Sequence, residues 1–186
     1  MMRVLLVVFL FIVNNAIFAG DALPSDSVYH VGGAWQTESN ETIQLEFLVG
    51  KPQVIALIYT GCTNSCPVIV ESMKRIEKKI PAKMRSQIGF VLISLTPDTD
   101  YPKVLKAFAE KKKLNQNWKL LRGNNELVRT LSNALNGRYK VINDGDVAHS
   151  NTVTLLNEKG QIELQSNGSL NGIKPIVEYI GKNYSH

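Results

Sequence analysis

The sequence predicts an α/β fold in which a central mixed sheet is flanked by helices. Two short continuous apolar runs, residues 54–59 and 88–95, are typical of strands that are buried on both faces. Segments with apolar residues at helical spacing alternate with these runs, which indicates parallel strands joined by helices. Residues 157–160 (Asn-Glu-Lys-Gly) then separate two strand-like segments, which is a β-hairpin signal and predicts an antiparallel pair.

The first half of the chain supplies the first alternation. An irregular lead-in over residues 20–41 precedes a short strand that is expected over 42–47. A helix is expected over 67–80, because Pro67 suits a first helical turn that does not need its N–H group, and Pro81 follows the last turn. The apolar residues of this helix recur at helical spacing, at Ile69, Met73, Ile76 and Ile80.

The second half continues the pattern. Asp100 is the expected N-cap of a helix over 102–113, because a short side-chain oxygen satisfies the first N–H groups of a helix. The apolar spacing of Leu127, Leu131 and Leu135 predicts a further helix. The elements expected beyond residue 113 are a short strand over 118–121, a helix over 124–135, hairpin strands over 151–156 and 161–165, and a helix over 172–182.

In this order the elements follow the thioredoxin plan with one inserted helix, and the C-terminal hairpin and helix complete it. A length of 186 residues, with 44% hydrophobic and 20% charged residues, fits one globular domain, which we place at residues 42–186. The net charge is only +5 and the basic residues are scattered, so the composition does not favour nucleic-acid binding.

Residues 1–19 have the pattern of a secretory signal peptide. Arg3 precedes the apolar run 4–13, and Ala16 to Ala19 provide a small-residue exit, so cleavage is expected after Ala19. The run is shorter than the roughly 20 apolar residues that a membrane span needs. We therefore expect an exported, periplasmic protein with no transmembrane segment in the mature chain. The alternative is a retained inner-membrane anchor, with the domain facing the periplasm.

The two cysteines, Cys62 and Cys66, lie between a buried strand and the helix that follows it. Open α/β sheets place their functional sites at this edge, and the start of a helix favours the thiolate form of cysteine. A purely structural disulfide over so short a loop would stabilise the fold by only about 2 kcal/mol. A redox dithiol and a pair of metal ligands remain, and their spacing alone does not separate the two.

His149 favours the metal. It directly precedes the strand at 151–156, which is expected to run antiparallel to the strand at 54–59 and so to start at the edge where the cysteines lie. Two thiolates and one imidazole suit copper, either Cu(I) or Cu(II). A structural zinc site would need four protein ligands, and the sequence offers no good fourth.

The other candidate ligands fit other roles. His30 and His186 lie near the ends of the chain and are not expected to bind the metal, and Met73 belongs to the apolar stripe of its helix. Asp144 and Asp146 are expected either to form a loop turn or to orient His149 through a hydrogen bond.

These motifs together resemble the Sco/SenC family of copper chaperones. The marks are Tyr59-Thr60-Gly61-Cys62 through Cys66-Pro67, the stretch from Ile93 to Asp100, and Val147-Ala148-His149-Ser150-Asn151. The resemblance covers roughly residues 32–182. It implies a thioredoxin-like fold, one copper ion held by Cys62, Cys66 and His149, and delivery to the copper A centre of a cytochrome c oxidase. It also implies two partners, a copper donor protein and the copper-bearing oxidase subunit or another copper acceptor.

The chain departs from the family pattern at three positions. Thr63, Thr96 and Ala148 stand where the family often has proline, aspartate and aspartate respectively. None of the three changes removes a ligand, but Ala148 puts the tuning of His149 in doubt.

The alternative function is a thiol-disulfide oxidoreductase that reduces cysteines in an oxidase subunit or another exported protein, with Cys62 as the attacking thiolate and a reversible Cys62–Cys66 disulfide.

Overall fold

The computed structural model describes residues 22–62, 65–142 and 146–184. A seven-stranded sheet has the order β2-β1-β5-β4-β3-β8-β9, and β6 and β7 form a separate two-stranded sheet. The strands are β1 (Trp35–Thr37), β2 (Thr42–Ile43), β3 (Gln53–Ile58), β4 (Gly89–Ser94), β5 (Trp118–Arg122), β6 (Tyr139–Val141), β7 (Val147–His149), β8 (Thr152–Leu156) and β9 (Ile162–Asn167). The helices are α1 (Ser65–Lys79), α2 (Pro102–Lys112), α3 (Asn125–Ala134) and α4 (Lys174–Asn183), with 3-10 turns η1 (Val28–His30), η2 (Leu45–Leu48) and η3 (Ala82–Met84).

The centre of the sheet is formed by the two apolar runs of the sequence. Every residue of β3 and β4 is buried, and the two strands pair in parallel from Gln53 with Gly89 to Ile58 with Ser94. On the other side of β3, strand β8 pairs antiparallel, as the sequence predicts. The carboxyl ends of β3 and β4 therefore lie at the same edge of the sheet as the start of β8.

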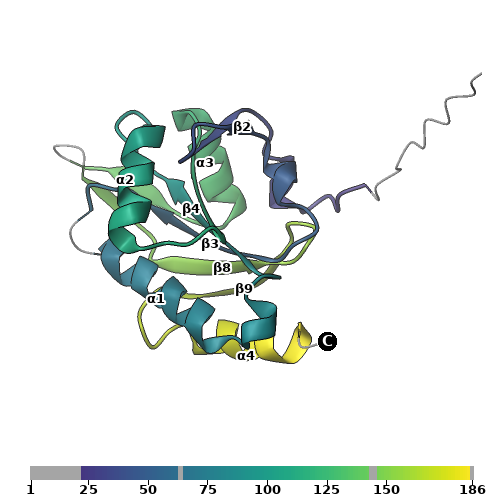
Figure 1. The fold of residues 1–186 in the computed structure, drawn as a ribbon. Coiled ribbons are helices and arrows are strands. Elements are labelled where there is room, and N and C mark those ends of the chain that lie inside the picture. Colours follow the sequence, from purple (N-terminus) through teal and green to yellow (C-terminus); the bar gives the residue numbers. More distant parts are fainter. Residues whose placement is uncertain (1–21, 63–64, 143–145, 185–186) are drawn as a thin grey trace, which may run out of the picture.

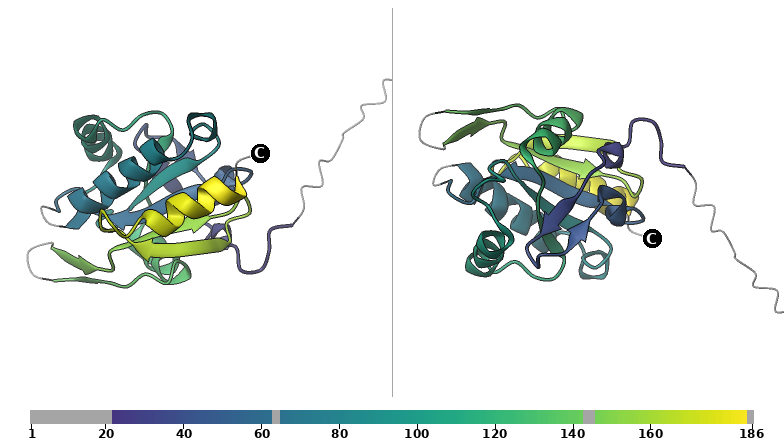
Figure 2. Two further views of the ribbon diagram at one scale, coloured as in Figure 1. Left: turned by 90° about the horizontal axis from the view of Figure 1, so that it is seen from below. Right: turned by 90° about the horizontal axis from the view of Figure 1, so that it is seen from above.

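The helices cover both faces of the sheet. Helices α1 and α4 pack below it and α3 packs above it in the view of Figure 1. Helix α2 packs along β5 and β1, as Figure 2 also shows. The apolar faces of the helices and the sheet form one continuous core, in which the rings of Phe90 and Trp118 stack with centroids 4.9 Å apart. The fold is thioredoxin-like, which confirms the fold class predicted from the sequence.

Three regions of the chain differ from the sequence-based prediction. Trp35–Thr37, in the lead-in that was expected to be irregular, forms β1 and pairs with β5 and β2. The strand expected over 42–47 is shorter, because Leu45–Leu48 turn into the 3-10 helix η2 and bury Leu45 and Leu48. The strands β6 and β7 form between the expected helix at 124–135 and the expected strand at 151–156, where no strand was predicted.

Asp100 does not cap α2, which corrects the role expected for it. The N-cap position is Tyr101, and no side chain bonds to the first N–H groups of the helix there. Asp100 is instead buried and bonds to the end of β3, as described below.

The signal peptide expected over residues 1–19 lies outside the described residues. Of the helices in the described part of the chain, none is both long and apolar enough to cross a membrane.

Candidate metal centre

Cys62 lies on a tight turn that follows the carboxyl end of β3. The turn is closed by a hydrogen bond from the Cys62 backbone N–H to the Tyr59 carbonyl oxygen, at 3.2 Å. Helix α1 then begins at Ser65. The backbone N–H of Cys66, in the first turn of that helix, donates to Cys62 Sγ at 3.3 Å. A helix amino terminus carries a partial positive charge, so this contact favours negative charge on the Cys62 sulfur.

A buried carboxylate holds this turn in place. Asp100 is 1% exposed and accepts hydrogen bonds from the backbone N–H of Thr60, at 3.1 Å, and from the Thr60 hydroxyl. The hydroxyls of Ser94 and Thr96 also donate to Asp100, at 2.7 and 3.1 Å. Asp100 therefore ties the end of β4 to the residue two positions before Cys62. Sequence reasoning assigned it a local capping role and missed this contact, which spans 40 positions of the chain.

His149 reaches the cysteines from β7. Its Nε2 lies 3.5 Å from Cys66 Sγ, although the two residues are 83 positions apart in the chain. The other ring nitrogen, Nδ1, lies 3.1 Å from the Ser150 carbonyl oxygen. If Nδ1 carries the proton and donates to that carbonyl, Nε2 presents its lone pair toward the sulfur. Burial lowers the pKa of His149, which favours the neutral ring that binds metals.

Tyr59 lies against the His149 imidazole and bonds to Asp146. The ring of Tyr59 stands edge-on to that of His149, with centroids 6.1 Å apart and an interplanar angle of 82°. The Tyr59 hydroxyl donates to the Asp146 carboxylate, which links the end of β3 to the start of β7. This hydrogen bond, together with burial, raises the pKa of Tyr59 above its usual value. The sequence offered one signal for Tyr59, its place between a buried strand and the first cysteine.

Of the two roles expected for Asp146, a hydrogen bond that orients His149 is not the one it takes. Its carboxylate accepts from the Tyr59 hydroxyl and from the backbone N–H of Val147, and the Ser150 carbonyl contacts the imidazole instead. Asp146 acts on His149 only as a nearby charge, which opposes the lowering of its pKa. Asp144 lies outside the described residues.

Of the other candidate ligands, His30 and Met73 lie among the described residues. His30 Nε2 contacts the Pro24 carbonyl at 2.8 Å and His30 is exposed, at the opposite end of the sheet from the cysteines. Met73 is fully buried in the core. His186 lies outside the described residues.

The three sequence-predicted ligands thus meet at one edge of the sheet. Cys66 is buried, whereas Cys62 and His149 are partly exposed, and both cysteines are thiols rather than a disulfide. Within the described residues, no set of three or more His, Cys, Asp or Glu side chains is already closed around a metal position. The donor set of two sulfurs and one neutral imidazole fits a soft cation that accepts two or three ligands.

Comparison with known proteins gives a consistent match. The SCO1/SenC family model matches residues 26–180. A putative copper-binding protein of Stutzerimonas stutzeri is 26% identical over 149 residues, which is 77% of this chain and 72% of that protein. A SCO1/SenC family lipoprotein from Bacillus anthracis superposes with a TM-score of 0.73 at 24% identity, over 80% of this chain and 90% of that one. Arabidopsis thaliana ScoI, solved with copper bound, superposes with a TM-score of 0.71 at 17% identity, over 83% and 98%.

Proposed function

Since the chain belongs to the SCO1/SenC family, we propose that it is a copper-binding metallochaperone. In this proposal Cys62, Cys66 and His149 hold one copper ion, which the protein delivers to the copper A centre of a cytochrome c oxidase. The observation that carries the proposal is the 3.5 Å approach of His149 Nε2 to Cys66 Sγ. Copper-bound structures of proteins with the same fold, and a relative described as copper-binding, support it.

The geometry suits a site that takes up and releases its cargo. Cys66 is fully buried and fixed in the first turn of α1, whereas Cys62 is partly exposed on the preceding turn. Copper arriving from a donor protein would meet Cys62 first and then gain Cys66 and His149. Release would reverse the order, as each ligand of the acceptor replaces one ligand of the chaperone. Because burial lowers the pKa of His149 and so favours the neutral ring, copper need not displace a proton from the imidazole.

An anaerobic Cu(I) competition titration of the reduced protein tests the ligand set. His149→Ala is expected to weaken copper binding by at least about 100-fold, because the loss of a mere outer-shell contact already costs about 10- to 100-fold. His30→Ala is the matched control, since His30 is exposed and bonds to Pro24 away from the site. Equal copper affinity of the two variants would refute ligation by His149.

Delivery is tested separately, by mixing the copper-loaded protein with a metal-free copper A domain and measuring the copper content of each after separation. Transfer is expected to be complete within the mixing experiment for the wild type. Retention of copper by the chaperone would contradict delivery while leaving copper binding intact. Export is part of the same proposal, and mass spectrometry of the protein recovered from the periplasm is expected to show a chain that begins at Gly20.

A second function is favoured by the contact between the Cys66 N–H and Cys62 Sγ. A Cys62 thiolate stabilised in this way can attack a disulfide of a partner protein and form a mixed disulfide, with one partner thiolate leaving. Cys66 then displaces the second partner thiolate, which leaves the partner reduced by two electrons and Cys62 joined to Cys66. Exchange with an oxidised peptide, in the absence of copper, is expected to be lost in Cys62→Ser. Exchange that persists in this variant would exclude the reductase.

A further inference from the structure

The edge of the sheet farthest from the cysteines is where β3, β4 and β5 begin, and we call it the basal edge. The Asn117 side chain lies at this edge, where Lys51 precedes β3 and Ile88 precedes β4. Its amide oxygen accepts from Lys51 Nζ at 2.8 Å, and its amide nitrogen donates to the Ile88 carbonyl oxygen at 2.8 Å. Strand β3 has six residues. At roughly 3.3 Å per residue it separates the basal edge from the Cys62 turn by about 20 Å.

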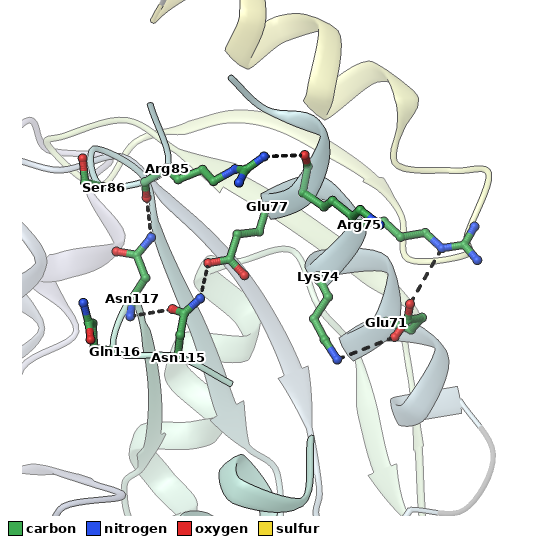
Figure 3. Close-up of a pocket in the computed structure, with 10 residues that line it drawn as sticks. Glu71, Lys74, Arg75, Glu77, Arg85, Ser86, Asn115, Gln116 and Asn117 are labelled. Carbon is green, nitrogen blue, oxygen red and sulfur yellow. Dashed lines mark hydrogen bonds and ion pairs between the residues drawn. The ribbon is translucent and has the colours of Figure 1, made fainter. Parts of the chain in front are cut away.

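A basic groove opens at the basal edge. It has a volume of about 620 Å³ and lies between α1, the segment after η3 and the loop before β5. The basic residues that line it are Lys74, Arg75, Lys78 and Arg85. Figure 3 shows Lys74, Arg75 and Arg85 around the groove. Lys74 Nζ donates to the Lys112 carbonyl at 3.1 Å, which brings the end of α2 alongside. We call these four residues, together with Lys83 and Lys111–Lys113, the basic patch.

The acidic side chains of the groove do not cancel this charge. Glu77 accepts from Trp118 Nε1 at 3.0 Å and from Asn115 Nδ2 at 2.9 Å. Glu71 lies 4.0 Å from Lys74 and 3.9 Å from Arg75, where both partners are exposed to solvent. The eight basic residues of the patch thus face three acids, Glu71, Glu77 and Glu110, in the same segments. With eight basic residues against three acids, the patch carries five more basic than acidic side chains.

Exposed apolar side chains stand beside the basic patch. Phe47 is 63% exposed and Val49 is 44% exposed, and both line a second groove that shares Asn117 with the first. Lys119 Nζ lies 5.9 Å from the centre of the Phe47 ring. An exposed aromatic ring flanked by lysines is typical of proteins that lie on a bilayer surface, where the ring enters the interface and the cations meet the headgroups.

The first described residues leave the domain at the same edge. Ser27 Oγ donates to the Lys159 carbonyl at 2.6 Å, and the Gly50 N–H donates to the Glu158 carbonyl at 2.8 Å. These contacts place the amino-terminal segment beside η2 and the turn between β8 and β9, which Figure 1 shows on the side away from the start of α1.

We infer that the basal edge docks on an anionic phospholipid surface, with the basic patch on the headgroups and Phe47 and Val49 in the interface. The copper site then faces away from the membrane. An acidic protein is the other class of partner that the charge suits, but it gives no reason for Phe47 and Val49 to be exposed beside the patch. Nor would docking here bring a copper acceptor near Cys62, which is a strand length away.

Vesicle partitioning of the copper-free protein tests the inference. Binding is expected to vesicles that contain phosphatidylglycerol, not to pure phosphatidylcholine, and is expected to weaken strongly between about 0.1 M and about 1 M salt. The patch variant Lys78→Glu/Lys83→Glu/Lys111→Glu is expected to lose about 100-fold or more in partitioning, since each cation near an anionic bilayer contributes roughly fivefold. The matched control Lys103→Glu/Arg129→Glu/Lys140→Glu changes the net charge equally, on exposed positions elsewhere, and is expected to lose less than about tenfold.

Phe47→Ser tests the apolar contribution. It is expected to weaken partitioning by several-fold at both salt concentrations, because salt does not screen apolar burial. Equal losses in the patch variant and the control would overturn the inference, because net charge alone would then explain binding. Binding to polyglutamate but not to the vesicles would also overturn it and would assign the patch to an acidic protein. Since no copper is used, failure of the proposed copper function would not alter these results.

Discussion

Removing the Asp100 carboxylate isolates what holds the Cys62 turn in place. Asp100→Ala leaves four donors without their acceptor, two from Thr60 and one each from Ser94 and Thr96. The Thr60 and Thr96 hydroxyls are partly exposed and can turn to water, whereas Ser94 is fully buried and the Thr60 N–H cannot rotate. A hydrogen bond to a charged group is worth about 1.5–3 kcal/mol. Because the Ser94 hydroxyl and the Thr60 N–H would then be buried without an acceptor, we expect the free energy of unfolding to fall by about 3–5 kcal/mol.

Urea unfolding of the reduced protein measures this loss, which should appear as a lower midpoint at an unchanged slope. Asp98→Ala is the matched control, because Asp98 is exposed and accepts from Asn125, and it should change the free energy of unfolding by less than about 0.5 kcal/mol. In a copper titration Asp100→Ala should also weaken binding about tenfold, since the turn that carries Cys62 loses its anchor. A free energy of unfolding within about 1 kcal/mol of the Asp98→Ala value would refute the reasoning.

Three further variants test the core and the amino-terminal segment by urea unfolding. Met73→Ala should cost about 2–5 kcal/mol but leave copper affinity within about threefold, because Met73 is buried in the core; a large loss of affinity would instead point to a ligand. Tyr29→Phe should raise stability by about 1 kcal/mol, because among the described residues the buried hydroxyl has no hydrogen-bond partner. Burial also raises the pKa of the Tyr29 hydroxyl above its ordinary value of 10.0. The unfolded chain therefore loses the hydroxyl proton at lower pH than the folded protein, and the free energy of unfolding falls as pH rises above 10.0. This fall should be shallower in Tyr29→Phe, and an equally steep fall in the variant would contradict the role of the hydroxyl. Gly160→Ala should cost about 1–3 kcal/mol, because Gly160 has a φ of +79° and a Cβ there would lie 2.5 Å from the Tyr29 ring; no loss would show that the turn relaxes.

The large elements could be predicted because their signals are local. Six consecutive buried residues in β3 and in β4 produce apolar runs that few other structures would give. The helices carry both apolar spacing and end signals, and α3 begins after Asn124, which accepts from the Leu127 N–H as an N-cap. The short strand β1 was not predicted, because its pairing with β5 depends on residues far away in the chain. Strand β1 has three residues and gains its partner, β5, about 85 positions along the chain.

The proximity of His149 to Cys66 could be predicted because topology, rather than local pattern, brings the two residues together. A strand that runs antiparallel to β3 must start where β3 ends, so His149 had to lie near the cysteines once β8 was assigned. The groups that surround the proposed ligands were harder to find. Asp100 and Tyr59 act through side-chain contacts with residues 40 and 87 positions away, and neither contact leaves a periodic signal in the sequence.

The geometry of β7 shows what alanine at position 148, where the family often has aspartate, means for His149. Neighbouring side chains of a strand point to opposite sides, and in β7 Val147 is buried, Ala148 is exposed and His149 is partly buried. A side chain at position 148 therefore points away from the side on which the imidazole meets Cys66. The Ser150 carbonyl, at 3.1 Å from Nδ1, already supplies the contact that orients the ring. An aspartate at position 148 would act on His149 mainly as a charge on the exposed face, where solvent screens it, so its replacement by alanine leaves the orientation of the proposed ligand intact.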